Sequence, residues 1–257
     1  TNGGSLAFQV KENNWLGEGK NVSFDIDINE ESVRGTLDYV DPNYNFLGNS
    51  LGYSVSSVTN DKPDQGYENS IFAIGASTSF EQYNNVFANL GINLSYDDLR
   101  TTSNASSSLQ RQSGEFGELS ANYGLLYDRR DRSFMPTSGS IISFKQTLPI
   151  TADKPYIGNT FSSSSYHTIN ESIVGAAKIY LATINGLDNE DVRISKRKFL
   201  STSRLRGFER GKVGPLDNGD FVGGNYVTTV NMSAELPVLE SLDTITLSSF
   251  YDAANVW

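Results

Sequence analysis

The sequence contains no cysteine and a single histidine, His167, among its 257 residues. No disulfide, cysteine nucleophile or cysteine-ligated metal is therefore available to this chain, and one histidine argues against a transition-metal centre. No apolar run approaches the roughly 18 residues that a membrane helix requires. The formal net charge is −10, which argues against nucleic-acid binding, because phosphate recognition needs a broad basic face.

Two motifs that would signal chemistry are incomplete. In GFERGKV (207–213) the glycines are one residue too close for a phosphate-binding loop, and Val213 stands where serine or threonine is required. His167 lies among serines in SSSSYHTIN (162–170), but no nucleophile elbow accompanies it, so a serine hydrolase is not indicated. The sequence therefore predicts a protein that is not an enzyme and uses no cofactor and no metal.

Regular alternation of apolar and polar residues runs through most of the chain. In NVSFDIDINE (21–30) every second residue is apolar, and ELSANYGLLYD (118–128) repeats the pattern. A period of two residues is typical of β-strands. Twelve segments follow it, at 5–12, 21–30, 33–40, 50–60, 70–80, 86–98, 118–128, 140–148, 161–170, 173–185, 224–236 and 245–254. We predict an all-β protein with one domain over residues 1–257, no amphipathic helix and no domain linker.

The connections between these segments are of two kinds, which roughly alternate. Short ones such as NNWLGEGK (13–20) and PVLESLD (237–243) predict tight turns, and longer polar ones such as 101–117 and 187–223 predict loops. Short turns at one end, long loops at the other and a polar face opposite an apolar face are typical of a transmembrane β-barrel. A soluble β-sandwich also alternates and is the competing interpretation, although its strands are usually shorter.

The basic residues of this acidic chain are concentrated in one segment. Seven of the 20 lysines and arginines lie between Lys196 and Lys212, around SRLRGFERGKVGP (203–215). A run of cations is often only the solvent-exposed surface of an external loop, and this interpretation fits residues 196–198. An arginine that instead reaches inward-facing carboxylates would form a forked ion pair, and this second interpretation also accounts for the glycine and phenylalanine beside Arg206.

The residues around this segment resemble a known family. LRGF (205–208), followed by GP at 214–215, is similar to the arginine-glycine-phenylalanine signature of the BamA-like outer-membrane assembly factors, the bacterial surface antigen superfamily. DYVDPNYNFLGNSL (38–51), YDRRDRSFMPTSGS (127–140) and SFYDAANVW (249–257) resemble further motifs of that family in the same order. The resemblance extends over nearly the whole chain.

The fold implied by the resemblance is a sixteen-stranded barrel with a long external loop, here 187–223, that folds into the lumen. This chain would supply about twelve strands, with the family's first strand and last three strands missing. Twelve strands can close a barrel in principle, but because this chain would be only a piece of the complete set, we expect these residues to form an open, curved sheet whose strands at 5–12 and 245–254 do not pair with each other.

The resemblance also implies site residues. Arg206 would be the loop arginine, with Glu235 and Asp252 as its acidic partners. Gly207 would permit a close turn against which Phe208 packs.

A second implied motif lies in a turn at the periplasmic rim. Asp128 and Asp131 would hold the geometry of this turn, together with Pro136 and Gly139. Ordinary turn chemistry also accounts for the proline and the glycine.

The function implied by the resemblance is assembly and insertion of β-barrel proteins into the bacterial outer membrane, by strand templating and local disturbance of the bilayer. The partners would be unfolded outer-membrane protein clients, accessory lipoproteins and the lipid bilayer, with no nucleic acid. A polypeptide-secretion pore of the same superfamily and a passive porin are the alternatives. We also expect neutralisation of Lys196, Arg197 and Lys198 to matter little compared with loss of Arg206.

Overall fold

The computed structural model describes residues 4–170, 173–237 and 246–257. Its main element is a twelve-stranded antiparallel sheet in which each strand pairs with the next one along the chain. The strands are β1 (Ser5–Trp15), β2 (Lys20–Asn29), β3 (Ser32–Asp41), β4 (Ser50–Lys62), β5 (Tyr67–Tyr83), β6 (Val86–Thr101), β7 (Gly114–Asp128), β8 (Gly139–Ala152), β9 (Tyr156–Asn170), β10 (Ile173–Gly186), β13 (Tyr226–Pro237) and β14 (Thr246–Val256).

The remaining elements are short and lie in the connections. β11 (Leu216–Asp217) and β12 (Asp220–Phe221) pair with each other between β10 and β13. η1 (Pro63–Gln65) follows β4, and α1 (Ser107–Gln110) is a single helical turn after β6. We expected no amphipathic helix, and α1 is only a single turn, which the Ser106 hydroxyl caps by accepting the Leu109 N–H at 3.2 Å. Within the described ranges, no helix is long and apolar enough to cross a membrane.

All twelve predicted strands are present in the predicted order. The largest differences are at the starts of β9 and β7, which begin at Tyr156 and Gly114 rather than at 161 and 118, and at the end of β8, which is Ala152 rather than 148. The extra residues at the two starts do not alternate in hydropathy, but their backbone groups continue the hydrogen-bonded ladder. Most of the turn predicted at 237–243, and the first residue of the strand predicted at 245–254, lie outside the described residues.

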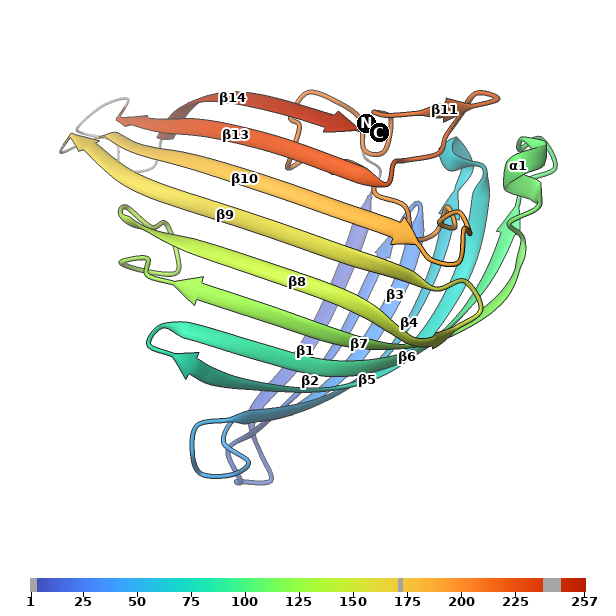
Figure 1. Ribbon diagram of the computed structural model, residues 1–257. Helices are drawn as coiled ribbons and strands as arrows, with labels where there is room; N and C mark the ends of the chain where they lie inside the picture. The colour runs from blue at the N-terminus through green and yellow to red at the C-terminus, as the bar shows by residue number, and fades with distance from the viewer. Residues whose placement is uncertain (1–3, 171–172, 238–245) are drawn as a thin grey trace.

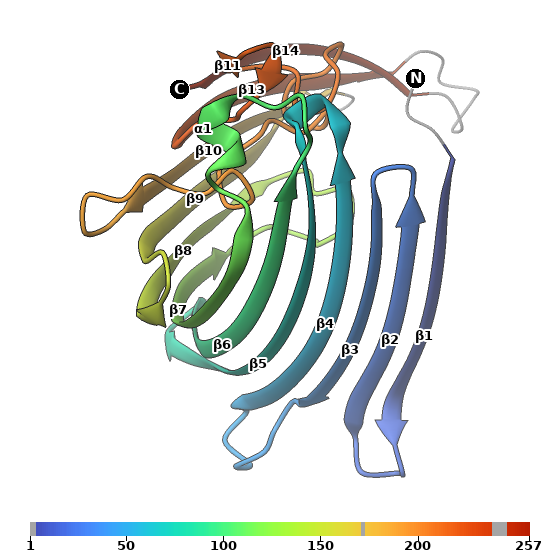
Figure 2. The same cartoon turned by 90° about the vertical axis from the view of Figure 1, so that its right-hand side faces the viewer.

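The sheet is strongly curved and open (Figures 1 and 2). Its edges are β1 and β14, which pair only with β2 and β13 respectively. The open, curved sheet that the sequence analysis expected is therefore confirmed.

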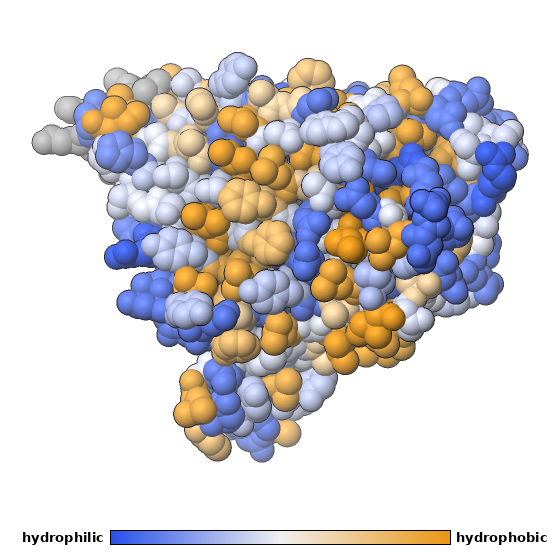
Figure 3. All heavy atoms as spheres, in the orientation of Figure 1, coloured by the Kyte–Doolittle hydropathy of each residue, from blue (hydrophilic) through white to orange (hydrophobic). Residues whose placement is uncertain are grey.

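The two faces of the sheet have the polarity of a membrane barrel. Along β6 the outward side chains of Ile92, Leu94 and Tyr96 are exposed, while Ser95 and Asp97, on either side of Tyr96, are buried. A soluble sandwich would bury the apolar set instead. Hydrophobic side chains are spread over the outer face in Figure 3, so this wall is suited to lipid outside and to polar groups inside.

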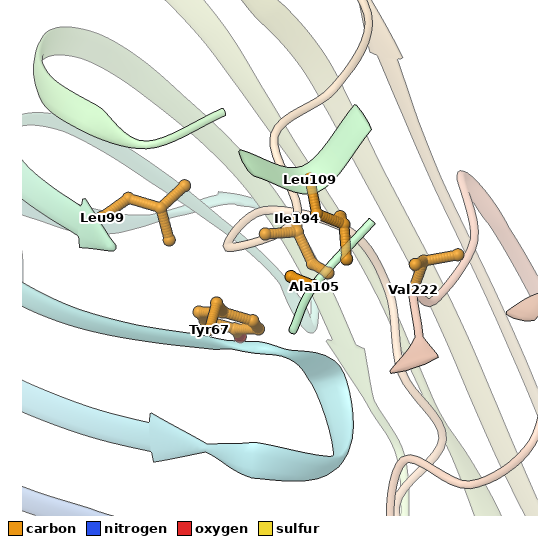
Figure 4. Close-up of a cluster of buried hydrophobic side chains, with 6 residues drawn as sticks. All are labelled: Tyr67, Leu99, Ala105, Leu109, Ile194 and Val222. Carbon is orange, nitrogen blue, oxygen red and sulfur yellow. The ribbon is translucent and has the colours of Figure 1, made fainter. Parts of the chain in front are cut away.

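The segment between β10 and β13, residues 187–225, packs against the inner face of the sheet. Two small apolar clusters hold it there. One joins Ile194 and Val222 to Tyr67 of β5, Leu99 of β6 and the α1 connection (Figure 4). The other joins Leu200 and Leu205 to side chains of β10, β13 and β14. We call residues 187–225 the inner loop, and it is a packed part of the fold.

Candidate functional site

The tip of the inner loop is fixed to β14 by Arg206. The Arg206 Nε and Nη2 donate to the two carboxylate oxygens of Asp252 at 2.7 and 2.6 Å, and the Arg206 backbone N–H donates to Asp252 at 3.1 Å. The guanidinium also lies 3.7 Å from the centre of the Phe250 ring. A forked pair with a stacked aromatic fixes both the position and the plane of the guanidinium.

Asn231 of β13 completes this contact. It pairs with Asp252 across the two strands, and its Nδ2 donates to Asp252 and to the Arg204 backbone carbonyl, both at 2.8 Å. Arg204 lies 3.5 Å from the Tyr180 ring centre on β10. The hydrogen bonds to Asp252 raise the pKa of Arg206. We call Arg206, Asp252, Phe250 and Asn231 the tip seat.

Glu235, the second predicted partner, does not lie in the tip seat. It pairs with Ser248 across β13 and β14 and is four positions beyond Asn231, which is roughly 13 Å along a strand. Within the described part of the chain, no ion pair joins Glu235 to Arg206. The alternation places Glu235 on the inner face, but the register puts an amide, Asn231, where the sequence analysis expected a carboxylate.

The two residues that follow Arg206 also differ from expectation. Gly207 has φ 86°, and a Cβ at this position would meet no atom within 4 Å. The glycine is therefore suited to the left-handed backbone conformation, not to a close approach. Phe208 is more than half exposed, and the aromatic ring that covers Arg206 belongs to Phe250.

The base of the inner loop has a second anchor, on strands β6 and β7, which are distant from β13 and β14 in the sheet. The Arg193 Nη1 lies 3.5 Å from Asp97 of β6, and its Nη2 lies 3.8 Å from Glu118 of β7. The Lys196 Nζ lies 2.9 Å from the same Glu118. The side chains of Arg193, Asp97 and Glu118 are only 4%, 2% and 4% exposed. We call these four residues the wall seat.

Neighbouring groups also donate hydrogen bonds to the carboxylates of the wall seat. Asn69 and Ser195 each donate to Asp97 at 2.8 Å, and Tyr156 donates to Glu118 at 3.0 Å. Burial lowers the pKa of Arg193. Burial also opposes the charge of Lys196, but the nearby Tyr156 and Glu118 outweigh it and raise the pKa of Lys196. Desolvated charges that are paired in this way are costly to separate.

The cations at 196–198 are therefore not a solvated run. Arg197 binds Asp191 at 2.6 Å and donates to the Val192 carbonyl at 3.1 Å. Lys198 forms a β-bridge with Gly224, and burial lowers the pKa of its side chain. Because Lys196 belongs to the wall seat, we expect its neutralisation to destabilise the loop more than the sequence alone suggested.

The turn between β7 and β8 is held by its aspartates. Asp131 accepts hydrogen bonds from the Thr137 hydroxyl at 2.7 Å and from the backbone N–H groups of Thr137 and Ser138. Asp128 binds the Arg130 guanidinium in a fork. Gly139 has φ 91°, and a Cβ here would lie 2.1 Å from the Arg129 carbonyl oxygen. Pro136 follows Met135, which has φ 49°.

The Asp131 turn has a testable dependence on pH. Its hydrogen bonds, that from the Thr137 hydroxyl first, lower the pKa of Asp131 to about 2. A lowered pKa means that the turn is stabilised above the ordinary carboxyl pKa and loses this contribution as pH falls from about 4 to about 2. We expect Thr137→Val to raise the pKa of Asp131, because the hydrogen bond from the Thr137 hydroxyl is lost, and an NMR titration of the Asp131 carboxyl carbon measures this pKa. Equal pKa values in the two proteins would contradict the assigned role of Thr137.

These features define a class of protein: an outer-membrane-type barrel wall with a basic loop fixed to its inner face. The Omp85 superfamily domain matches residues 14–257, and the chain belongs to that superfamily.

Similar proteins and structures agree with this assignment. The chain is 24% identical to the outer membrane protein assembly factor BamA of Neisseria meningitidis, over 96% of this chain and 34% of that protein. It is 21% identical to the human sorting and assembly machinery component 50 homolog, over 87% of this chain and 48% of that protein. The crystal structure of Haemophilus ducreyi BamA lacking POTRA domains 1–3 superposes with a TM-score of 0.88 at 22% identity, covering 98% of this chain and 55% of that one. The chain thus spans about a third to a half of the length of the curated relatives that it matches.

Proposed function

We propose that this chain is the membrane part of a β-barrel assembly factor, which inserts unfolded outer-membrane proteins into a bacterial outer membrane without bond chemistry. The observation that carries the proposal is the inner loop with its two seats. The wall seat fixes the base of the loop to β6 and β7, and the tip seat fixes the tip to β13 and β14. The loop is in this way a strut between distant parts of one curved sheet.

A strut of this kind suits a barrel whose strand edges must be offered to other chains. Opening a sheet exposes backbone N–H and C=O groups that a bilayer cannot satisfy. An incoming strand can satisfy them by pairing with the edge. The two seats keep the rest of the wall in register while an edge is free. The relatives named as assembly factors support the same function.

The bacterial outer membrane and the accessory lipoproteins are part of this proposal. Its support is the likeness to BamA proteins from two bacteria, one in sequence and one in structure. The human relative shows that the superfamily is not confined to bacteria.

The experiment that tests the function measures client folding. The full-length protein is reconstituted in lipid vesicles, and a urea-denatured barrel protein is added. We expect folding to be accelerated about tenfold or more over protein-free vesicles, which corresponds to a barrier lower by about 1.4 kcal/mol. Vesicles that contain an equal amount of a porin are the control. A rate no higher than that control, together with steady ion conductance, would indicate a passive pore instead.

A further inference from the structure

The short turns at one end of the sheet carry exposed apolar side chains at their tips. Leu16 lies between β1 and β2, Phe46 and Leu47 between β3 and β4, and Phe134 and Met135 between β7 and β8. Leu16, Phe46 and Phe134 are 80%, 90% and 81% exposed. These turns lie along the lower and left-hand margin of the sheet in Figure 1. We call these five residues the apolar rim.

The shorter connections at the opposite end of the sheet lack such tips, and the exposed Phe208 and Leu216 at that end belong to the inner loop. The four shorter connections, at residues 30–31, 63–66, 102–113 and 153–155, are all described by the structure, and none of them exposes a large apolar side chain. The apolar side chains of the 102–113 connection, Ala105 and Leu109, are buried under the inner loop. Among the described turns and shorter connections, exposed apolar tips therefore occur at one end of the sheet.

The turns do not need these side chains in order to form. In the β3–β4 turn, side-chain oxygens of Asp41, Asn43 and Asn45 accept backbone N–H groups. In the β7–β8 turn, Asp131 does the same. The rim side chains take no part in these hydrogen bonds and are exposed, so local folding does not account for them.

The backbone conformation of three rim residues strengthens this point. Leu16, Phe46 and Met135 have φ values of 55°, 58° and 49°, in the left-handed region that bulky side chains rarely adopt. The β5–β6 turn has Asn85 at φ 61°, which is the residue type that this conformation favours. One turn thus uses the locally favoured residue, and three turns hold apolar residues against local preference.

We propose that the apolar rim inserts into the interfacial layer of the lipid bilayer at this end of the barrel. At the β1–β2 turn the rim adjoins Trp15, the last residue of β1, whose apolar side chain is also exposed. It also occurs on turns spread along the sheet, from β1–β2 to β7–β8, whereas a single protein partner would cover one side. Arg129 and Arg132, which are exposed in the same β7–β8 connection as Phe134, are suited to lipid phosphates.

The proposal is tested by measuring depth in a membrane. Cysteines introduced at Phe46 and Phe134 of the full-length protein carry an environment-sensitive fluorophore, and any cysteines outside this chain are replaced. The protein is reconstituted in vesicles of phosphatidylethanolamine and phosphatidylglycerol. We expect lipid-borne spin labels to quench both positions and aqueous iodide not to reach them. Asn104→Cys, in the β6–β7 connection at the other end, is the control and should be reached by iodide.

A set of substitutions separates lipid contact from folding. The triple variant L16N, F46N and M135N places a favoured residue at each left-handed position, so its stability in detergent micelles should be equal or higher. We expect it to fold into vesicles about tenfold more slowly, since apolar contact with lipid is lost. Iodide quenching at both tips, or unchanged insertion of the triple variant, would overturn the proposal and leave the rim to a protein partner. Neither readout depends on the assembly of clients, so failure of the proposed function would not affect them.

Discussion

The substitution Arg193→Met is expected to lower the free energy of unfolding by about 3–5 kcal/mol, the range for removing one partner of a buried ion pair. It leaves the carboxylates of Asp97 and Glu118, which are almost fully buried, without their shared guanidinium. Lys196 can still neutralise Glu118 at 2.9 Å, but Asp97 keeps only neutral donors. Methionine keeps an unbranched apolar stem of similar course, but the contact of the Arg193 guanidinium with the Phe116 ring is lost as well. Urea unfolding of the full-length protein in detergent micelles measures the change.

The matched control is Arg100→Met. Arg100 also pairs with an aspartate, Asp98 at 2.8 Å, but its side chain is 69% exposed, so its loss should cost only about 0–1 kcal/mol. The double variant D97N and R193M should recover part of the loss, because one unpaired charge is then removed, and the double-mutant cycle gives the coupling between the two residues. If R193M and R100M were equally stable, the wall seat would not be an anchor.

The strands were the most predictable part of this molecule. In a membrane wall each side chain faces either lipid or the interior, so hydropathy alternates with little interference from the rest of the fold. Strand ends such as the start of β9 at Tyr156 were missed, because residues beyond the lipid need not alternate although their backbones still pair. The open edges followed from the resemblance, and periodicity alone did not indicate them.

Hydropathy alternation predicted only part of the candidate site. Asp252 lies in a clear alternation, so its inward direction could be predicted. Choosing Asn231 over Glu235 requires the register of β13 against β14, which a single sequence does not contain. The wall seat was missed because Asp97 and Asp98 are adjacent and only one can face inward, and because its partner Arg193 is separated from it by almost a hundred residues. No local pattern records such a contact.

Substitutions of Arg206 should show whether the two parallel hydrogen bonds to Asp252 stabilise the loop more than the positive charge alone does. We expect Arg206→Ala to cost about 1.5–3 kcal/mol, the range for hydrogen bonds to a charged group, because the guanidinium itself is partly exposed. Arg206→Lys keeps the charge but cannot donate to both Asp252 oxygens in one plane or stack on Phe250 in the same way, so it should recover less than half of that loss. Proteolysis within 200–215 of the folded full-length protein reports release of the loop tip.

The two carboxylates once expected to act together provide the decisive comparison. Asp252→Asn removes the charge that faces Arg206 and should expose the loop tip to protease as much as Arg206→Ala does. Glu235→Gln changes a residue roughly 13 Å further along β13 and should leave both cleavage and client folding unchanged. If E235Q released the tip and D252N did not, the arginine would rest on a different carboxylate and the strut would be positioned differently in the barrel. If neither variant changed cleavage while R193M did, the wall seat alone would hold the inner loop, and the arginine-glycine-phenylalanine segment would need another role.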